Sequence, residues 1–277
     1  MRTWKKRHKL TLWSVIVIVV ALIAVRAARA QTNEQIVNAG FELPYNEQGA
    51  GPIQVPHGWA AWWEDGLHDI PGIQGGSAAQ YPTGRPEYKA ATLDIDPHRV
   101  RSGGAAAQWF NYSRTGYAGL LQRVNVEQGA RYAFSVWAQC WSGDSNDPTI
   151  CPPDRAYISL GIDPDGGTWV GSRAIVWTQW SAVGPDYVNF DSLAVDARKD
   201  TITLFVSVAF KWALRHNDVY LDDAALQRIA EGTTPEPCPT AIPCPSCPTP
   251  EPCAPGSVDY ARIKQDVYDV ISTWDTR

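Results

Sequence analysis

Two long runs alternate between apolar and polar positions, as strands with one buried face do. They are RYAFSVWAQCW at residues 131–141 and TITLFVSVAFKW at residues 201–212. Successive side chains of a strand point to opposite faces. One set from each run is therefore expected in the core: Phe134, Val136 and Ala138 from the first, and Ile202, Leu204, Val206 and Val208 from the second.

Shorter β-rich runs fill the rest of residues 31–230, separated by clusters of Gly, Pro, Asn and Asp. They are ATLDI, AAAQWF, GLLQRVNV, AYISLGI, SLAVDA and VYLDDAAL. About ten strands in one segment of this length are typical of a single sandwich or jelly roll. We therefore predict one all-β domain over residues 31–230.

The first thirty residues have the composition of a targeting segment. A basic start is followed by the apolar run Leu10–Val25 and by an A-x-A sequence at Ala28–Ala30. The run is shorter than the ~20 residues that span a bilayer, which favours a cleaved signal peptide and export to the cell envelope or the exterior. Because Arg26 and Arg29 lie beside the cleavage sequence, an uncleaved N-terminal membrane anchor is the alternative.

Two segments follow the β domain. Residues 231–256 form a Pro/Thr/Cys-rich linker, which is expected to be extended and semi-rigid. Residues 257–277 predict a short amphipathic helix, because apolar residues recur every three or four positions: Ile263, Val267, Val270, Ile271 and Trp274. A helix this short needs a partner, which would be another copy, another protein or the chain's own domain.

The six cysteines all lie after the targeting segment. Cys140 and Cys151 flank a polar loop, and in an oxidising compartment we expect them to form a disulfide rather than remain free thiols. The other four lie in the linker, where adjacent prolines disfavour wrapping around zinc: Cys238, Cys244, Cys247 and Cys253. Disulfides within or between chains are expected there, with the pairing left open.

The net charge argues against two kinds of anionic partner. The chain has 24 basic and 29 acidic residues, and residues 1–30 hold seven of the basic ones and none of the acidic ones. The remainder therefore carries 17 basic and 29 acidic residues, a net charge of −12. Such an acidic domain has no electrostatic footprint for nucleic acid or for an anionic membrane surface.

The polar side of the two long strands is the candidate binding face. Trp137, Gln139 and Trp141 alternate with the core positions of the first strand, and Lys211 lies on the corresponding side of the second. Flat aromatic rings beside amide groups suit sugars, whose C–H faces stack on rings and whose hydroxyls need hydrogen-bond partners. The alternative is that these tryptophans are structural and buried under loops.

The order of six motifs resembles that of carbohydrate-binding modules of the CenC-like type, which have a galactose-binding-like jelly roll. The motifs are NAGFE, HGW, RVRSGGAAAQWF, YAGLLQRVNVEQGARYAFSVWAQ, TITLFVSVAF and NDVYLDDAAL. Each motif is short, and their order and spacing carry the resemblance. It spans roughly residues 35–229 and leaves out the linker and the tail.

The resemblance implies a two-sheet β-sandwich that binds glycan chains without cleaving them and holds a structural calcium. Glu42 and Asp222 match the family's calcium carboxylates, with backbone oxygens around Gly40 and Arg101 as further ligands; calcium accepts several oxygens in flexible geometry. Trp137 and Gln139 match positions facing the family's sugar groove, and Trp63 falls in a loop that can border it.

Two alternative functions remain. A glycosidase would need two carboxylates about 5–10 Å apart across a groove, and no strand pattern fixes such a pair among Glu64, Asp65, Asp69 and Glu87. We therefore expect no enzymatic activity. The stronger alternative is a cell-envelope protein that keeps the fold, binds protein partners and assembles through its tail and linker cysteines.

Overall fold

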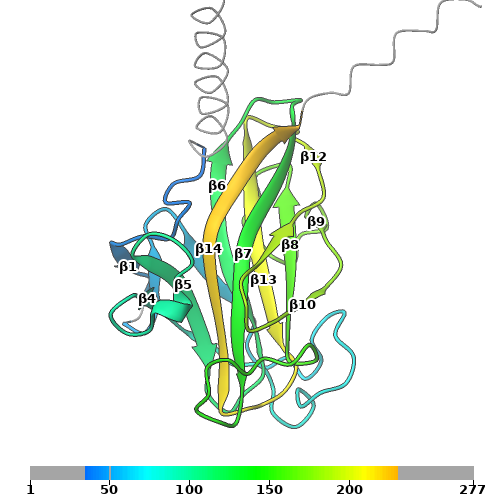
Figure 1. Cartoon of the computed structure of the whole chain (residues 1–277). Helices are drawn as coiled ribbons and strands as arrows, with labels where there is room; N and C mark the ends of the chain where they lie inside the picture. The colour runs from blue at the N-terminus through cyan, green and yellow to red at the C-terminus, as the bar shows by residue number, and fades with distance from the viewer. Residues whose placement is uncertain (1–34, 50, 230–277) are drawn as a thin grey trace, which may run out of the picture. The chain divides into compact units, whose positions relative to one another are not determined.

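The computed structural model describes residues 35–49 and 51–229, which form a two-layer antiparallel β-sandwich (Figure 1). This confirms the predicted all-β, jelly-roll class. The predicted targeting segment, linker, linker cysteines and tail helix lie outside the described residues. Within the described part of the chain, no helix is long and apolar enough to cross a membrane.

The first layer, called the β7 sheet here, has the strand order β11-β7-β14-β5-β4, with β12 beside β7. Its strands are β4 (Glu87–Thr92), β5 (Ala105–Asn111), β7 (Arg131–Gly143), β11 (Val188–Asp191), β12 (Val195–Asp196) and β14 (His216–Ile229). The turn η1 (Pro97–Arg99) lies in the connection from β4 to β5.

The second layer, called the β13 sheet, has the order β10-β8-β13-β6-β3, with β9 beside β8. Its strands are β3 (Ala60–Trp63), β6 (Gly116–Asn125), β8 (Ala156–Asp163), β9 (Val176–Trp177), β10 (Ser181–Val183) and β13 (Thr201–Phe210). A separate pair joins β1 (Tyr45–Glu47) and β2 (Gln54–Pro56). In Figure 1, β7 and β14 pass in front of β6, β13 and β8.

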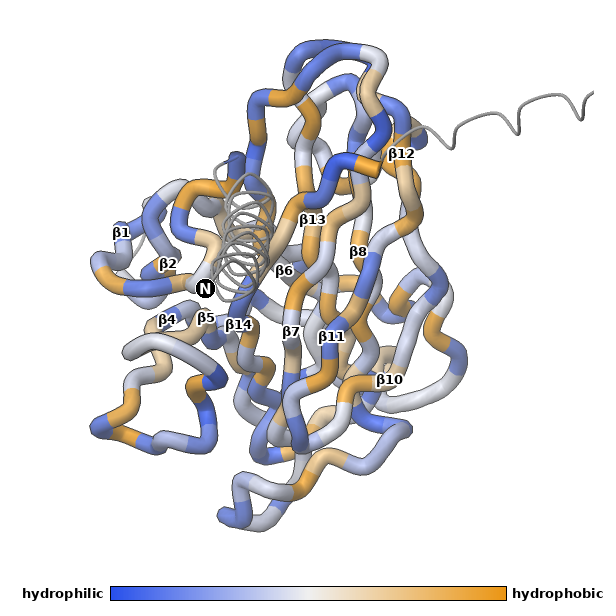
Figure 2. The backbone as a smooth tube through the Cα atoms, turned by 45° about the horizontal axis from the view of Figure 1, so that its top comes forward, coloured by the Kyte–Doolittle hydropathy of each residue, from blue (hydrophilic) through white to orange (hydrophobic). Residues whose placement is uncertain are grey.

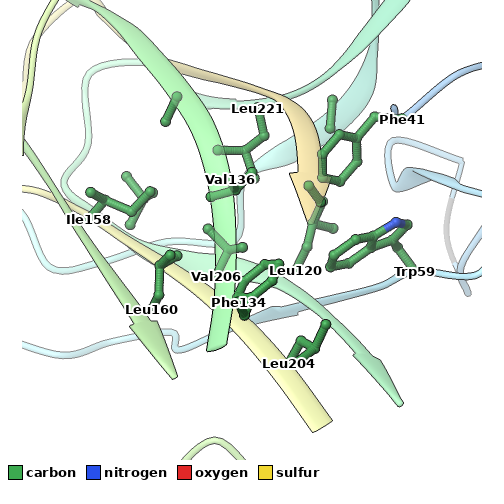
Figure 3. Packing of buried hydrophobic residues seen from close by; sticks show 14 of the residues in the cluster. Phe41, Trp59, Leu120, Phe134, Val136, Ile158, Leu160, Leu204, Val206 and Leu221 are labelled. Carbon is green, nitrogen blue, oxygen red and sulfur yellow. The ribbon is translucent and has the colours of Figure 1, made fainter. Parts of the chain in front are cut away.

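The core lies between the two layers and is built as the alternation predicted. Phe134 and Val136 of β7 face Leu204 and Val206 of β13, and all four are fully buried (Figure 3). Hydrophobic and hydrophilic positions are interspersed along the strands (Figure 2), so each strand offers only one of its faces to this core.

The outer faces of the sandwich are also covered in part. On β13, Phe205 and Ser207 point away from the core and are nevertheless 0% and 1% exposed. Ile70 and Ala78, from the long connection between β3 and β4, pack on the outward side of Ala209. Loops therefore act as additional layers, which strand alternation does not reveal.

A β-bulge interrupts the pairing of β14 with β7. The register shifts between Asp222 and Ala225, and Asp223 takes a left-handed conformation with φ of 47°. Bulges bend a strand and redirect its side chains, often next to binding sites. Two adjacent carboxylates lie at this bulge, Asp222 fully buried and Asp223 partly exposed.

The long predicted strands are confirmed, and two short ones are corrected. The run ATLDI belongs to β4 only as far as Thr92, after which the chain turns. In SLAVDA only Val195 and Asp196 pair, as β12. Both runs are apolar enough to read as strands, but a turn and a loop end the pairing. Short strands such as β1, β9 and β10 have too few residues to show a period.

The disulfide predicted between Cys140 and Cys151 is present, with Cα atoms 5.9 Å apart. We expect the double substitution Cys140→Ala/Cys151→Ala to lower the free energy of unfolding by about 2–3 kcal/mol, because it frees a short loop in the unfolded chain. Urea denaturation without reductant measures this. Unchanged stability would show that the bond does not constrain the fold, and reduced wild-type protein serves as the matched comparison.

Candidate functional site

The outer face of the β7 sheet carries three residues that the sequence assigned to ligand binding. Trp137, Gln139 and Trp141 alternate with the core residues of β7, as predicted. In the register with β14, Asp222 lies opposite Trp137 and Tyr220 lies opposite Gln139. Two adjacent strands therefore present indole rings, an amide, a phenol and a carboxylate on one surface.

The β4–β5 loop, residues 93–104, folds over this surface. Gln139 donates from Nε2 to the carbonyl oxygen of His98 at 2.6 Å. The hydroxyl of Tyr187, which precedes β11, donates to the carbonyl oxygen of Arg99 at 2.8 Å. The side chains of Gln139 and Tyr187 thus hold the backbone of the loop above β7.

Ring-stacking side chains already lie on both indole rings. The guanidinium carbon of Arg101 is 3.7 Å from the ring centroid of Trp137, and that of Arg99 is 5.3 Å from the ring of Trp141. The ring of His216 also stacks on Trp141, with centroids 3.7 Å apart. Cations over aromatic rings are attracted by the ring quadrupole. Trp141 is consequently only 8% exposed, whereas Trp137 is partly buried.

A cavity of about 360 Å³ remains beside the β4–β5 loop. Gln139, Tyr187 and Tyr220 line it together with three loop segments, residues 96–99, 148–149 and 185–186. Its size lies at the lower end of the ~300–1,000 Å³ that ligand pockets occupy. We refer to it as the β7 pocket.

The polar groups of the β7 pocket include two phenols and one ion pair, besides the amide of Gln139. Burial, followed by the charge of Asp222, raises the pKa of Tyr187. Burial, followed by the charge of Asp218, raises the pKa of Tyr220. Both hydroxyls are therefore protonated at neutral pH, and their oxygens can accept hydrogen bonds, while the proton of Tyr187 is already donated to the carbonyl of Arg99. Asp96 and Arg99 form the ion pair, at 3.1 Å.

Asp218 is an acidic group buried on the same face. It accepts a hydrogen bond from Nε2 of Gln108 at 2.7 Å and is 6% exposed. Burial raises the pKa of Asp218 from its ordinary value of 3.8 to about 6, although the Gln108 hydrogen bond and the charge of Arg99 oppose the shift. Ionisation of Asp218 is thus less favourable in the folded protein than in the unfolded chain.

The substitution Asp218→Asn should therefore stabilise the protein at pH 8 and not at pH 3.5. Because the folded-state pKa is raised, the favourable contribution of Asp218 is present below pH 3.8 and is lost as pH rises through about 6. At about 1.4 kcal/mol per pKa unit, the gain at pH 8 is about 1–3 kcal/mol. Thermal unfolding at both pH values measures it. The exposed Asp94→Asn is the control, and an equal effect of Asp218→Asn at both pH values would contradict the assignment.

Two carboxylates fix the C-terminal half of the β4–β5 loop. Oδ2 of Asp222 accepts the backbone N–H groups of Arg101 at 2.9 Å and Ser102 at 3.0 Å. The carboxylate of Glu42 accepts the backbone N–H of Gly104 at 3.0 and 3.1 Å. Residues from the start of the domain and from its last strand thus meet at one loop.

The four residues predicted to ligate calcium are therefore neighbours. Arg101 is bonded to Asp222, and Gly40 adjoins Glu42 closely enough that an added Cβ would lie 3.7 Å from the Glu42 side chain. Burial raises the pKa of Tyr45, and the charges of Asp222 and then Glu42 raise it further. Among the residues described, no group of three or more His, Cys, Asp or Glu side chains could hold a metal. An ion here would depend on these two carboxylates and on backbone oxygens, a donor set that fits calcium.

Trp63 and Lys211 lie in the other sheet. Trp63 was expected in a loop bordering the sugar face, but it ends β3, packs partly against the core and donates from Nε1 to Asp65 at 3.1 Å. Lys211 follows β13, and its Nζ is 2.7 Å from Asp154. The prediction was wrong on their grouping with Trp137, because β3 and β13 belong to a different layer from β7 and Trp63 packs against the core.

The carboxylates weighed for glycoside hydrolysis are also divided between the layers. Glu87 is the first residue of β4 in the β7 sheet. The other three follow β3 of the β13 sheet along the chain: Glu64, Asp65 and Asp69. Glu87 therefore begins a strand of one layer, whereas the other three lie in the connection that leaves a strand of the other layer.

Sequence reasoning missed the residues that complete the β7 pocket. His98 and Arg99 lie in DPHRVRSGG, whose Pro and Gly residues indicate a loop but not the surface on which it folds. Tyr187 follows the sequence Gly-Pro-Asp just before β11. This short segment shows no alternation of apolar and polar residues. Only the tertiary structure brings these residues to Gln139.

No protein-family profile and no curated protein sequence matches this chain. Several solved structures are similar, and the following three are each less than 25% identical to this chain. A family 61 carbohydrate-binding module in complex with β-1,4-galactotriose is 15% identical, with 71% of this chain and 100% of that one covered and a TM-score of 0.43. The CBM22-1 xylan-binding domain of Xyn10C from Paenibacillus barcinonensis is 11% identical, with 73% and 98% covered and a TM-score of 0.39.

A CBM4 module is 14% identical, with 70% of this chain and 99% of that one covered and a TM-score of 0.36. These similar structures are carbohydrate-binding modules with β-sandwich folds, the kind of module that the sequence motifs resemble. Galactotriose and xylan are ligands of those proteins. Similarities at these identities and TM-scores do not assign a function to this chain.

Proposed function

We propose that this domain binds a polysaccharide or glycan in the β7 pocket without cleaving it. The observation that carries the proposal is the convergence of one amide and two phenols, from Gln139, Tyr187 and Tyr220, in a cavity of about 360 Å³. Sugar hydroxyls need several paired donors and acceptors, and buried amide and phenol groups supply both kinds.

The pocket also has surfaces for the apolar faces of a sugar ring. Tyr187 is partly exposed and lines the cavity, and Pro148 and Pro185 belong to its walls. We assign stacking to Tyr187, since the rings of Trp137 and Trp141 lie against Arg101, Arg99 and His216. The disulfide near the pocket is compatible with an exported protein, the localisation proposed from the N-terminal segment.

Affinity electrophoresis of the whole chain against a panel of soluble polysaccharides tests the proposal. Retardation by one polymer class is expected, and Gln139→Ala should weaken it about tenfold or more, because the variant loses a buried amide that also holds the β4–β5 loop. Gln128→Ala, in an exposed turn, is the matched control. No retardation of a folded protein across the panel would contradict glycan binding and favour the envelope-interaction alternative.

A structural calcium held by Glu42 and Asp222, with backbone oxygens of Gly40 and Arg101, is a second part of this proposal. Because both carboxylates bind the β4–β5 loop, the ion would fix the same loop that walls the β7 pocket. Calcium should raise the unfolding temperature by several degrees at saturating concentration. Chelator should reverse the rise, and Glu42→Gln should abolish it. An identical unfolding temperature with calcium and with chelator would contradict the site.

A further inference from the structure

The β4–β5 loop runs along the outer face of the β7 sheet and prevents an open groove across it. It covers successive rows of the sheet: Arg99 lies over Trp141, the His98 carbonyl over Gln139, and Arg101 over Trp137. The loop also packs through Val100 against the side of the sheet formed by β4 and β5. A sugar chain therefore has no free path from β11 across β7 and β14 to β4.

Both halves of the loop are held by specific contacts. In the first half, the Asp96 side chain accepts the backbone N–H of His98 at 3.0 Å and pairs with Arg99. In the second half, backbone N–H groups bond to Asp222 and Glu42. Such bonds to charged acceptors are stronger than neutral ones. The loop is thus a fixed wall of the pocket.

Two other segments close the pocket around Gln139. Residues 148–149 lie in the loop bounded by the disulfide, and Ser142 donates its backbone N–H to Ile150 at 2.8 Å. Residues 185–186 lie in the connection from β10 to β11, where Cys140 donates its backbone N–H to Gly184 at 2.8 Å. Three anchored segments from separate parts of the chain therefore surround one small space.

We propose that the β7 pocket binds the terminal one or two sugar residues of a glycan rather than the interior of a chain. This inference rests on the proposed glycan binding. A chain interior must enter a site at one side and leave at another, which requires an open groove. A cavity of about 360 Å³ with walls on three sides accepts an end and leaves the rest of the chain outside.

A fragmentation experiment tests this inference on the wild-type protein. The polysaccharide that retards the protein is hydrolysed to about a tenth of its length. The intact polymer and the fragments are then compared, at equal mass, as competitors for binding to the protein. If the protein binds chain ends, the fragments should compete about tenfold more strongly than the intact polymer, because fragmentation raises the number of chain ends per unit mass about tenfold. Xylo-, cello- and β-1,4-galacto-oligosaccharides of one to six units should show affinity that stops rising at two units.

The opposite pattern overturns the inference while leaving glycan binding intact. Fragments weaker per unit mass than the polymer, and affinity that rises steadily to six units, would indicate a groove that binds chain interiors. If neither polymer nor oligosaccharide binds, glycan binding fails and the inference fails with it. Arg99→Ala, which removes a side chain from the wall, should raise the affinity for intact polymer relative to fragments at least threefold. Arg123→Ala, exposed on β6, should leave that ratio unchanged.

Discussion

Replacing Asp222 by alanine is expected to lower the free energy of unfolding by about 3–5 kcal/mol. The side chain is fully buried and accepts three backbone N–H groups, those of Arg101, Ser102 and Asp223. Leaving a buried donor without a partner costs about 1–3 kcal/mol, and water entering the cavity recovers part of the total. Urea denaturation of the folded variant in the presence of chelator measures the loss without any contribution from a bound ion.

The neighbouring residue provides the control for this prediction. Asp223 adjoins Asp222 in the bulge, and its carboxylate pairs with the side chains of Arg101 and Ser102 at a partly exposed position. Asparagine tolerates the left-handed conformation that this position requires. Asp223→Asn should therefore cost less than about 1 kcal/mol. Equal losses for the two variants would mean that charge, and not the backbone hydrogen bonds, accounts for the effect of Asp222.

Replacing Phe134 by alanine should destabilise the protein to a similar extent, by about 3–5 kcal/mol. The ring is 0% exposed and lies between the two sheets, so the substitution removes a large apolar surface and leaves a cavity. Chemical denaturation with a matched exposed substitution, Tyr112→Ala, measures the difference. Tyr112 is 64% exposed, and its loss should change stability by no more than about 0.5 kcal/mol. A small effect of Phe134→Ala would contradict the close packing of the two layers.

Much of the fold could be predicted from the sequence because alternating apolar and polar residues along a long strand indicate which of its sides faces the core. The alternation around Phe134 correctly separated the core side of β7 from the side that carries Trp137 and Gln139. The disulfide could be predicted because its two cysteines lie at the two ends of one short loop. The proximity of Glu42 and Asp222 came from the resemblance to known modules, and the structure brings both to the β4–β5 loop.

The composition of the site could not be predicted in the same way. Alternation groups residues on one side of one strand, but it does not say which strands share a sheet. Lys211 was therefore grouped with Trp137, although β13 and β7 lie in different layers. Alternation also does not show which surface of the sheet a loop covers. Arg99 and Arg101 lie on the tryptophan rings in a loop whose backbone N–H groups bond to Asp222 and Glu42, long-range interactions without a sequence signature.

The most direct test of the central claim is a crystal structure of the protein with the oligosaccharide that it binds most tightly. We predict a terminal sugar in the β7 pocket, with its hydroxyls hydrogen-bonded to Gln139 and to Tyr187 or Tyr220, and with the rest of the chain leading away from the β4–β5 loop. Sugar bound at the β13 sheet instead, near Trp63 or Lys211, would contradict the assignment of the site.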